Sequence, residues 1–451
     1  MLEQIRNRMW NQVRNELADI HQSEVANIID ELPEAERTVV FRLLPGDKAT
    51  SVFEYLDPEI QQDIVKSLGN REVAAVLNEM SPDDRTAFLE RLPDHILKET
   101  LNLLTDDERH VASSLLGYEE NTVGRLMTPY YIQVQKDWTV EQTFEHIRKF
   151  GKKAETLNIV YVVDEHSRLI DDVQISRFLL ASPGAPVEQL MDYKFVALQD
   201  TMDKEEAVQV FRQYDRSALP VVTENGVLVG IVTVDDILDV AEEEATEDIQ
   251  KFGGLEALEL PYVETPLTTL IRKRAGWLVI LFLGEMLTAS AMGYFDHEIE
   301  KAVVLALFVP LVISSGGNSG SQAATLIIRA MALKELSLND WWYVMRREIV
   351  SGFSLGVVLG IIGVLRITVW QQLGIFNYTE HWLLVAATIF LSLIGIVMWG
   401  TLSGSMIPFI LKRVGVDPAT SSAPFVATLV DVTGLLIYFS VAAVMLRGTL
   451  L

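Results

Sequence analysis

Residues 421–446 read SSAPFVATLVDVTGLLIYFSVAAVML, an apolar stretch with a single charged residue, Asp431. About 20 consecutive apolar residues are enough for a helix to cross the hydrocarbon core of a bilayer. Four further stretches of sufficient length precede it, near 276–295, 303–328, 350–372 and 382–411. The sequence therefore predicts an α-helical transmembrane domain with five helices.

Basic residues are distributed unevenly among the loops that join these stretches. They gather before the first stretch, between the second and third, and between the fourth and fifth, whereas the other loops contain Lys301 or no basic residue. Loops on the cytosolic side of a membrane are enriched in Lys and Arg. The pattern therefore places the N-terminus in the cytosol and the C-terminus outside.

Asp431 lies at membrane depth, where a carboxylate costs roughly 2.5 to 3.5 kcal/mol on insertion scales. It should therefore face a water-filled path or pair with a buried cation, for which Arg366 is the candidate. Ala427 and Gly434 lie on the same face of the predicted helix as Asp431. Small residues at these positions keep the face open, as the lining of a pore requires.

The second apolar stretch is interrupted by Pro310 and by the glycine-rich segment SSGGNSGSQ at 314–322. Irregular backbone at membrane depth is tolerated where it is buried in protein or lines water, so this segment predicts a broken helix with free carbonyl groups. Those carbonyls and the amides of Asn318 and Gln322 are hard oxygen donors that suit a hydrated cation such as Mg²⁺. Composition does not separate Mg²⁺ from Ca²⁺ or Mn²⁺, and close helix packing through small residues is the alternative.

The net charge of −25 is confined to the first 250 residues, because residues 251–451 contain 13 basic and 13 acidic side chains. A surface this acidic repels nucleic acid and attracts metal cations. The chain has no cysteine, which excludes disulfides and thiolate metal sites. It also lacks a GxxxxGK[ST] loop, so pumping driven by nucleotide hydrolysis is unsupported. We do not expect an enzyme.

Residues 1–125 contain a repeat with a period of 24, marked by LPE at 32–34, LDP at 56–58, MSP at 80–82 and LTD at 104–106. Each unit predicts two short helices, and such units stack into an all-α superhelical N-domain. This domain is either a packing scaffold or a part that moves when its acidic surface is neutralised.

Residues 126–240 contain a second duplication, at an offset of 64. Each half reads helix, strand, strand, helix. The second half ends in GIVTVDD at 230–236, and the whole segment resembles a tandem pair of CBS domains with an α/β fold.

The CBS resemblance implies a ligand. Thr233 and Asp236 would bind the ribose and phosphates of ATP or another adenine nucleotide. Gln174 and Arg177 take the two corresponding places in the first half. The resemblance therefore supports one conventional nucleotide site at most, and a purely structural pair is the alternative.

Residues 240–265 predict one long polar helix that leads into the membrane part. It continues an acidic run at 235–248, in which Asp239 and Glu243, and also Glu243 and Glu247, are i,i+4 neighbours. Like charges at this spacing destabilise a helix by about 0.2–0.5 kcal/mol for each pair. Divalent cations are therefore expected to neutralise the run, and a solvated acidic face is the alternative.

Five motifs along the whole chain resemble the MgtE family of magnesium channels. They are YD at 214–215, EEATEDI at 243–249, GGNSGSQAAT at 316–325, VDPA at 416–419 and PFVATLVD at 424–431. The resemblance implies a homodimer in the lipid bilayer with a central pore. Its parts would be the N-domain (1–125), the tandem CBS domains (126–240), a plug or connecting helix (241–270) and the transmembrane pore domain (271–451).

The same resemblance implies the residues that bind cations. The pore ion would bind at Asp431 and near Ala427. The cytosolic sensing carboxylates would be Asp203, Glu205, Asp215, Asp236, Asp239, Glu244, Glu247, Asp248 and Asp417. Asp83 and Asp84 are further candidates from the N-domain.

The sequence thus predicts a magnesium-selective channel of the bacterial cytoplasmic (inner) membrane that serves magnesium homeostasis. Intracellular Mg²⁺ would bridge the acidic surfaces and hold the pore closed, and at low Mg²⁺ those surfaces would separate. A broader divalent-cation transporter and an exporter coupled to Na⁺ or H⁺ are alternatives. A third is a membrane-anchored nucleotide sensor, against which Asp431 and the interrupted second stretch argue.

Overall fold

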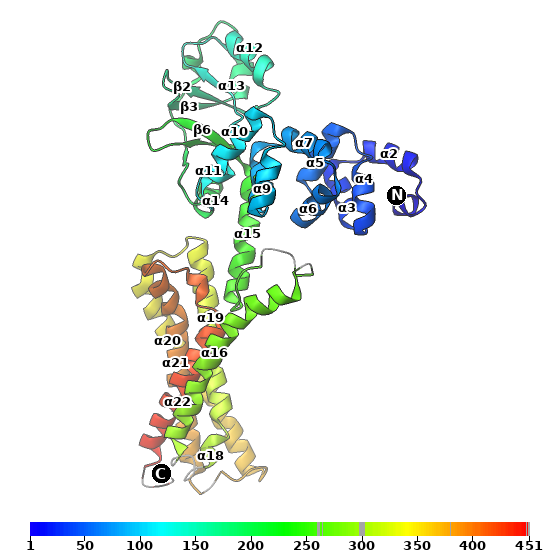
Figure 1. The fold of residues 1–451 in the computed structure, drawn as a ribbon. Coiled ribbons are helices and arrows are strands. Elements are labelled where there is room, and N and C mark those ends of the chain that lie inside the picture. The colour runs from blue at the N-terminus through cyan, green and yellow to red at the C-terminus, as the bar shows by residue number, and fades with distance from the viewer. Residues whose placement is uncertain (259–261, 264, 297–302, 379, 448, 450–451) are drawn as a thin grey trace. The chain divides into compact units, whose positions relative to one another are not determined.

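The computed structural model describes residues 1–451 except 259–261, 264, 297–302, 379, 448 and 450–451 (Figure 1). The chain forms two compact units, Met1–Glu242 and Glu243–Leu451. Each unit has its own architecture and its own core.

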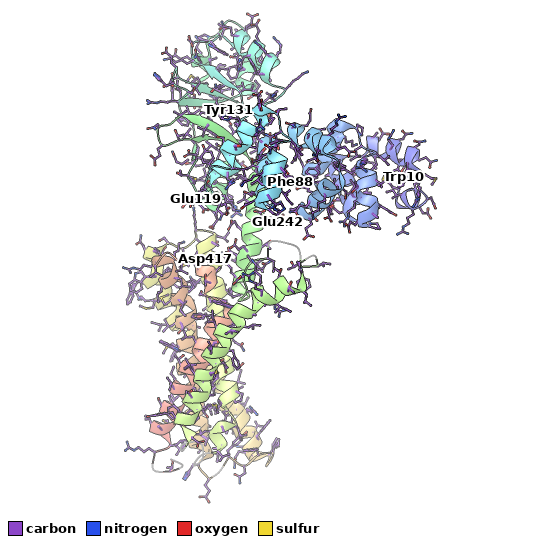
Figure 2. The ribbon with its side chains drawn as sticks, viewed as in Figure 1. Trp10, Phe88, Glu119, Tyr131, Glu242 and Asp417 are labelled. Carbon is purple, nitrogen blue, oxygen red and sulfur yellow. The ribbon has the colours of Figure 1, made fainter. Side chains whose placement is uncertain are left out.

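The first part of Met1–Glu242 is all-α, and its helices confirm the predicted repeat. The helices that open successive repeats begin 24 residues apart; they are α4 (Glu34–Phe41), α6 (Pro58–Ser67), α8 (Pro82–Glu90) and α10 (Asp106–Leu115). The other helices here are α1 (Leu2–Arg6), α2 (Trp10–Asp19), α3 (Gln22–Asp30), α5 (Gly46–Glu54), α7 (Asn70–Glu79) and α9 (Asp94–Leu101). Phe53 lies in the core of this part, edge-on to Phe41 and to Phe88 (labelled in Figure 2), with ring centroids 6.0 and 5.5 Å away.

The second part of this unit has the α/β pattern expected of paired CBS domains. Its elements are α11 (Val123–Leu126), β1 (Gln133–Gln135), α12 (Val140–Phe150), β2 (Ile159–Val163), β3 (Leu169–Gln174), α13 (Ile175–Leu180), η1 (Val187–Leu190), β4 (Leu198–Gln199), α14 (Lys204–Tyr214), β5 (Ala218–Val222) and β6 (Leu228–Thr233). The sheets β1-β2-β3 and β4-β5-β6 each pair one parallel and one antiparallel neighbour. The two halves therefore repeat one topology, as the duplication predicts.

The polar helix that follows differs from its prediction. Helix α15 spans Val234–Phe252, so the single helix predicted over 240–265 is wrong. Gly253 and Gly254 follow it, and Gly254 has a left-handed φ of +74°. A side chain is strained in that conformation, and a Cβ on Gly254 would lie 2.6 Å from the ring of Trp277. Glycine therefore ends the helix and allows the chain to pass close to this ring.

The second unit contains five helices that are long and apolar enough to cross a membrane among the residues that the structure describes. The elements of this unit are α16 (Leu267–Tyr294), α18 (Val303–Ala306), α19 (Val309–Ala332), η2 (Leu338–Asp340), α20 (Trp341–Gln372), α21 (Trp382–Arg413), η3 (Pro418–Thr420) and α22 (Ala423–Met445). Helices α19, α20, α21 and α22 form the packed centre of the bundle, and α16 lies along α22. The prediction of a five-helix membrane domain is confirmed.

The predicted break at 314–322 is wrong, because α19 is one continuous helix from Val309. Pro310 lies in its first turn, where the missing N–H would be unpaired in any case. The glycines instead bring two helices together: a Cβ on Gly400 or Gly404 would collide with the carbonyl oxygen of Gly316 or Gly320, respectively. Close packing of α19 on α21, the alternative in the sequence, accounts for these glycines.

Candidate functional site

Asp431 is half-buried on α22, opposite the glycine-rich face of α19. A Cβ on Gly317 would lie 3.7 Å from Oδ1 of Asp431 and 3.5 Å from the Cβ of Ala427. The two residues predicted to hold the pore ion therefore share one surface with Gly317. Because none of these neighbours is large, the carboxylate stays accessible at membrane depth.

Arg366, the candidate partner of Asp431, points elsewhere. Its guanidinium lies 4.3 Å from the ring centroid of Trp370 and 5.9 Å from that of Phe308. Within the described part of the chain, no Lys or Arg forms an ion pair with Asp431. The carboxylate therefore requires water or a mobile cation, as a pore site does.

Asn318 and Gln322 lie one turn apart on α19 and are both exposed. The amide of Asn318 donates a hydrogen bond of 3.5 Å to Oγ of Ser314, which is a weak contact. Because α19 is continuous, amide side chains are the oxygen donors here and backbone carbonyls are not. Only this part of the predicted donor set is present.

Sequence reasoning missed a second carboxylate in the membrane part, Glu285 of α16. Glu285 repels Asp431 electrostatically. The signal that would have found it is the one that found Asp431, namely an acidic residue within an apolar stretch.

In the first unit, carboxylates of the all-α part lie close to carboxylates of the CBS part and of α15, and together they form a cluster. Asp83 and Asp84 on α8 interact with Asp236 and Asp239 on α15. Glu54, Glu155 and Asp235 add further negative charge to the cluster. The structure therefore brings the N-domain candidates to two of the predicted sensing residues.

The carboxylates of the cluster repel one another. Asp83 is 8% exposed, and its Oδ1 has no hydrogen-bond partner in the described structure. Burial raises the pKa of Asp83 well above its usual range, and the nearby charges of Asp236 and Asp84 raise it further. Burial also raises the pKa of Asp236 to about 7, although the hydrogen bond from Thr233 acts in the opposite direction and lowers it.

These shifts predict a pH dependence of the stability of this unit without divalent cations. The folded unit binds protons more tightly than the unfolded chain, so the free energy of unfolding should fall as the pH rises from about 4 to about 7. Thermal unfolding of the purified residues 1–250 at several pH values, with and without Mg²⁺, measures this. Stability that rises over the same pH range in the absence of Mg²⁺ would contradict the prediction.

The other predicted sensing residues of this unit lie on α14. Asp203 caps its N-terminus and accepts a hydrogen bond of 2.8 Å from the backbone N–H of Glu205. Asp215 ends the helix in a left-handed conformation with φ +50°. The helix between them has 11 residues, or about 16 Å at 1.5 Å per residue. Within one chain, Asp203 and Asp215 therefore belong to different sites.

The remaining predicted carboxylates, Glu244, Glu247, Asp248 and Asp417, lie in the second unit, and Lys251 pairs with two of them. Nζ of Lys251 lies 2.7 Å from Oδ2 of Asp417 and also pairs with Glu247 one turn earlier. Burial disfavours the charged form of Lys251 and so lowers the pKa of its ammonium group. The hydrogen bonds to Asp417 and Glu247 outweigh this effect and raise the pKa. Asp417 (Figure 2) precedes the start of α22, so Lys251 ties the end of α15 to the helix that carries Asp431. Sequence analysis missed Lys251, whose partner is 166 residues away.

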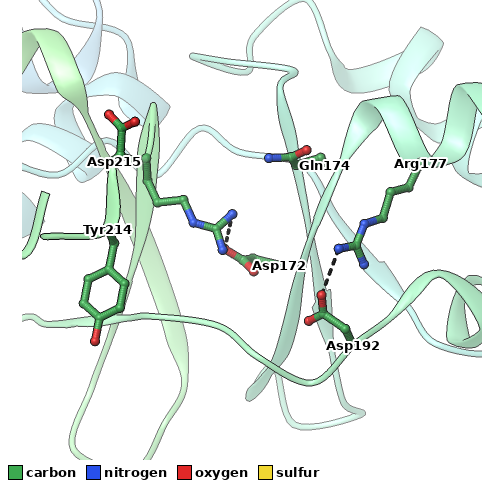
Figure 3. Close-up of a pocket in the computed structure, with 7 residues that line it drawn as sticks. Asp172, Gln174, Arg177, Asp192, Tyr214 and Asp215 are labelled. Carbon is green, nitrogen blue, oxygen red and sulfur yellow. Dashed lines mark hydrogen bonds and ion pairs between the residues drawn. The ribbon is translucent and has the colours of Figure 1, made fainter.

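A polar cavity of about 390 Å³ lies in the CBS part. It is lined by Asp172, Gln174, Arg177, Asp192, Tyr214, Asp215 and Arg216 (Figure 3). Arg177 pairs with Asp192 at 2.8 Å, and Arg216 lies 3.8 Å from Asp172. The cavity therefore contains Gln174 and Arg177, the residues that depart from the CBS pattern. Thr233 and Asp236 lie in the carboxylate cluster instead, where the Thr233 hydroxyl donates a 2.5 Å hydrogen bond to Asp236.

Comparisons with known proteins agree with this arrangement. Family models match a divalent cation transporter over residues 309–441, the MgtE intracellular N domain over 20–121 and a CBS domain over 187–243. The chain is 40% identical to the magnesium transporter MgtE of Thermus thermophilus, over 97% of this chain and 95% of the relative. The chain belongs to the MgtE family. It is also 30% identical to the magnesium transporter MgtE of Bacillus subtilis, over 96% of this chain and 94% of that one.

Two solved structures are similar to part of this MgtE chain. The soluble part of a magnesium transporter is 27% identical, with a TM-score of 0.51, over 54% of this chain and 96% of that structure. The cytosolic domain of the Mg²⁺ channel MgtE, solved in complex with ATP, is 38% identical, with a TM-score of 0.49, over 50% of this chain and 93% of that structure. The 40% identity to the Thermus thermophilus relative, over 97% of this chain, confirms the resemblance to the MgtE family drawn from the motifs.

Proposed function

We propose that this protein is a magnesium-selective channel of the bacterial cytoplasmic membrane that intracellular Mg²⁺ closes. The observation that carries the proposal is Asp431, a carboxylate at membrane depth that faces the small residues Gly317 and Ala427 and has no cationic partner in the described structure. The chain acts as a homodimer, with its N-terminus in the cytosol and its C-terminus outside. Membership of a family whose relatives are magnesium transporters supports this function.

In the pore, Mg²⁺ is the cargo and keeps most of its waters. Its hydration shell is lost reluctantly, so a wide polar surface with few carboxylates suits it better than a tight protein cage. Asp431 supplies the charge, and the amides of Asn318 and Gln322 supply weaker oxygen ligands for those waters.

On the cytosolic side, Mg²⁺ acts on the carboxylate cluster around Asp83 and Asp236. A divalent cation removes the repulsion between the carboxylates of α8 and α15 and so favours their close approach. Only the difference in Mg²⁺ affinity between the closed and open states moves the equilibrium. We assign Asp203, Glu205, Asp215, Glu244, Glu247, Asp248 and Asp417 to further cation sites of this kind.

Lys251 gives the second unit an ionic link that does not need Mg²⁺. Its ammonium group joins Glu247 to Asp417. Mg²⁺ bound at neighbouring carboxylates of α15 would strengthen a connection that already exists. Residues 241–270 thereby act as the connecting element between the sensor and the pore.

Transport by the purified protein in lipid vesicles tests the function. Uptake of Mg²⁺ should exceed uptake of Ca²⁺ and Mn²⁺ at the same external concentration. When the sensor domains face the interior of the vesicle, Mg²⁺ uptake should also fall as the internal Mg²⁺ concentration rises. Equal rates for the three ions would favour the broader divalent transporter. Uptake that requires a Na⁺ or H⁺ gradient would favour the coupled exporter.

We further propose that ATP or another adenine nucleotide binds in the CBS cavity of Figure 3. The side chain of Asp172 is 1% exposed and holds the guanidinium of Arg216 at 3.8 Å in the wall of the cavity. Arg177 and Arg216 offer positive charge for phosphate, and Tyr214 offers a ring for the base. This cavity provides a better set of contacts than Thr233 and Asp236, which bond to each other.

The two candidate positions give different results in a nucleotide titration. Arg216→Ala should weaken binding about tenfold or more, because a hydrogen bond to a charged group contributes about 1.5–3 kcal/mol. Thr233→Ala should leave the affinity unchanged. Calorimetric titration of ATP into the full-length protein and both variants measures this, and a loss confined to Thr233→Ala would place the nucleotide at Thr233 and Asp236.

A further inference from the structure

Helix α16 carries Glu285 near the middle of the membrane domain. Its neighbours Leu283 and Met286 are exposed apolar side chains, and Glu285 is itself exposed in the single chain. A carboxylate at membrane depth is costly unless it meets water or a polar partner. Glu285 therefore needs a polar environment in the working protein.

The register of α16 against α22 shows where that environment lies. The indole N–H of Trp277 donates a hydrogen bond of 3.1 Å to Oγ of Ser422. About two turns further on, a Cβ on Gly284 would lie 2.8 Å from Cγ2 of Thr428. The two helices therefore advance in the same direction.

This parallel alignment places the next turn of each helix at the same depth. Glu285 follows Gly284 on α16, and Asp431 lies one turn after Thr428 on α22. The mutual repulsion of the two carboxylates agrees with this placement. One chain therefore brings two carboxylates to one level of the membrane domain.

A buried hydroxyl at this level also lacks a partner. Thr288 lies one turn after Glu285, on the same side of α16. It is 8% exposed, and its Oγ1 has no hydrogen-bond partner in the described structure. The hydroxyls of Thr428 and Ser290, in contrast, donate to the backbone carbonyl four residues earlier. The free hydroxyl of Thr288 thus points to a polar ligand or water between α16 and α22.

We propose that Glu285 is a second pore carboxylate, which together with Asp431 and the Thr288 hydroxyl binds a hydrated divalent cation. The inference rests on the proposed pore at Asp431 and adds α16 to its lining. A divalent ion neutralises both carboxylates at once, whereas a monovalent ion leaves one charge uncompensated. The pair therefore favours Mg²⁺ over Na⁺, and the ion binds through its waters because Mg²⁺ gives them up reluctantly.

The first test compares Glu285→Gln with the wild type in lipid vesicles at low internal Mg²⁺. The external Mg²⁺ concentration that gives half-maximal uptake should rise about tenfold, and the preference for Mg²⁺ over Na⁺ should fall. Glu285→Asp should retain most of the affinity. Glu348→Gln makes the same chemical change on a different helix, α20, and should behave like the wild type.

The second test uses the absence of cysteine from the chain. In the Glu285→Cys variant the new thiol is the only one, and a charged, water-soluble thiol reagent should modify it. Added Mg²⁺ should slow the modification. Leu283→Cys, on the exposed apolar surface of the same helix, should stay unmodified in the bilayer.

The outcomes separate this inference from the proposed function. No Mg²⁺ uptake by the wild type would overturn the proposed channel itself. A transporting wild type with unchanged half-saturation in Glu285→Gln would overturn the role of Glu285 alone. If Glu285→Gln fails to insert, an unreactive Glu285→Cys thiol overturns the inference, and a reactive thiol that Mg²⁺ protects supports it.

Discussion

Replacing Asp431 with asparagine is expected to reduce Mg²⁺ uptake by at least about tenfold and to weaken the preference for Mg²⁺ over Na⁺. The change keeps the shape of the side chain and removes its charge. At about 5 Å, through one layer of water, a carboxylate attracts a divalent ion by about 1.7 kcal/mol even at the dielectric constant of water, which corresponds to more than tenfold in affinity. Flux into vesicles as a function of external Mg²⁺ measures the effect.

A control must separate this effect from a failure to fold. Val432→Ala changes the next residue on α22 without changing charge and should transport normally. Both variants should elute as the same oligomer as the wild type. If Asp431→Asn transports Mg²⁺ with unchanged rate and selectivity, Asp431 has only a structural role, and the proposed pore is wrong.

The second large effect concerns the carboxylate cluster of the first unit. The double variant Asp83→Asn/Asp236→Asn should make the protease resistance of this unit nearly independent of Mg²⁺. In the wild type, Mg²⁺ at millimolar concentration should protect residues 1–250 from protease, because it relieves the repulsion around the buried carboxyl of Asp83. Without that repulsion, the variant should resist protease in the absence of Mg²⁺ and gain little from adding it.

Channel activity should follow the same pattern. Open probability plotted against internal Mg²⁺ should fall less steeply in the variant, since fewer sites distinguish the closed from the open state. The matched control is Asp94→Asn/Asp137→Asn, which removes the same charge from two exposed positions outside the cluster. Protease patterns that respond to Mg²⁺ equally in the wild type and in both variants would remove the cluster from the sensing mechanism.

Patterns that repeat at short range were enough to predict the architecture. The 24-residue period, the duplicated helix–strand–strand–helix order and the five apolar stretches each reflect local constraints. A helix or strand shows its buried face through the spacing of its own residues, and a membrane helix shows itself through length and hydropathy alone. Asp431 was found in the same way, because a carboxylate is costly wherever the surrounding helix is apolar.

Local patterns failed where packing decided the outcome. Glycines at 314–322 indicate a broken helix when α19 is considered alone, yet Gly316 and Gly320 allow α21 to approach and leave α19 intact. Likewise, the polar segment 240–265 indicates one long helix, but the close approach of Trp277 to Gly254 accompanies the end of α15 at Phe252.

The composition of the sites depended on tertiary structure most of all. Asp83 becomes a strong candidate sensor only because folding brings α8 to α15, where burial makes its charge costly. Lys251 meets Asp417 across 166 residues, and Glu285 reaches the level of Asp431 through the parallel register of α16 and α22. The sequence by itself determined which residues can ionise and where most of the helices lie, since both follow from side-chain chemistry and local spacing. Only the tertiary structure decided which charges share a site, because electrostatic interactions act through distances in space that the order of residues does not specify.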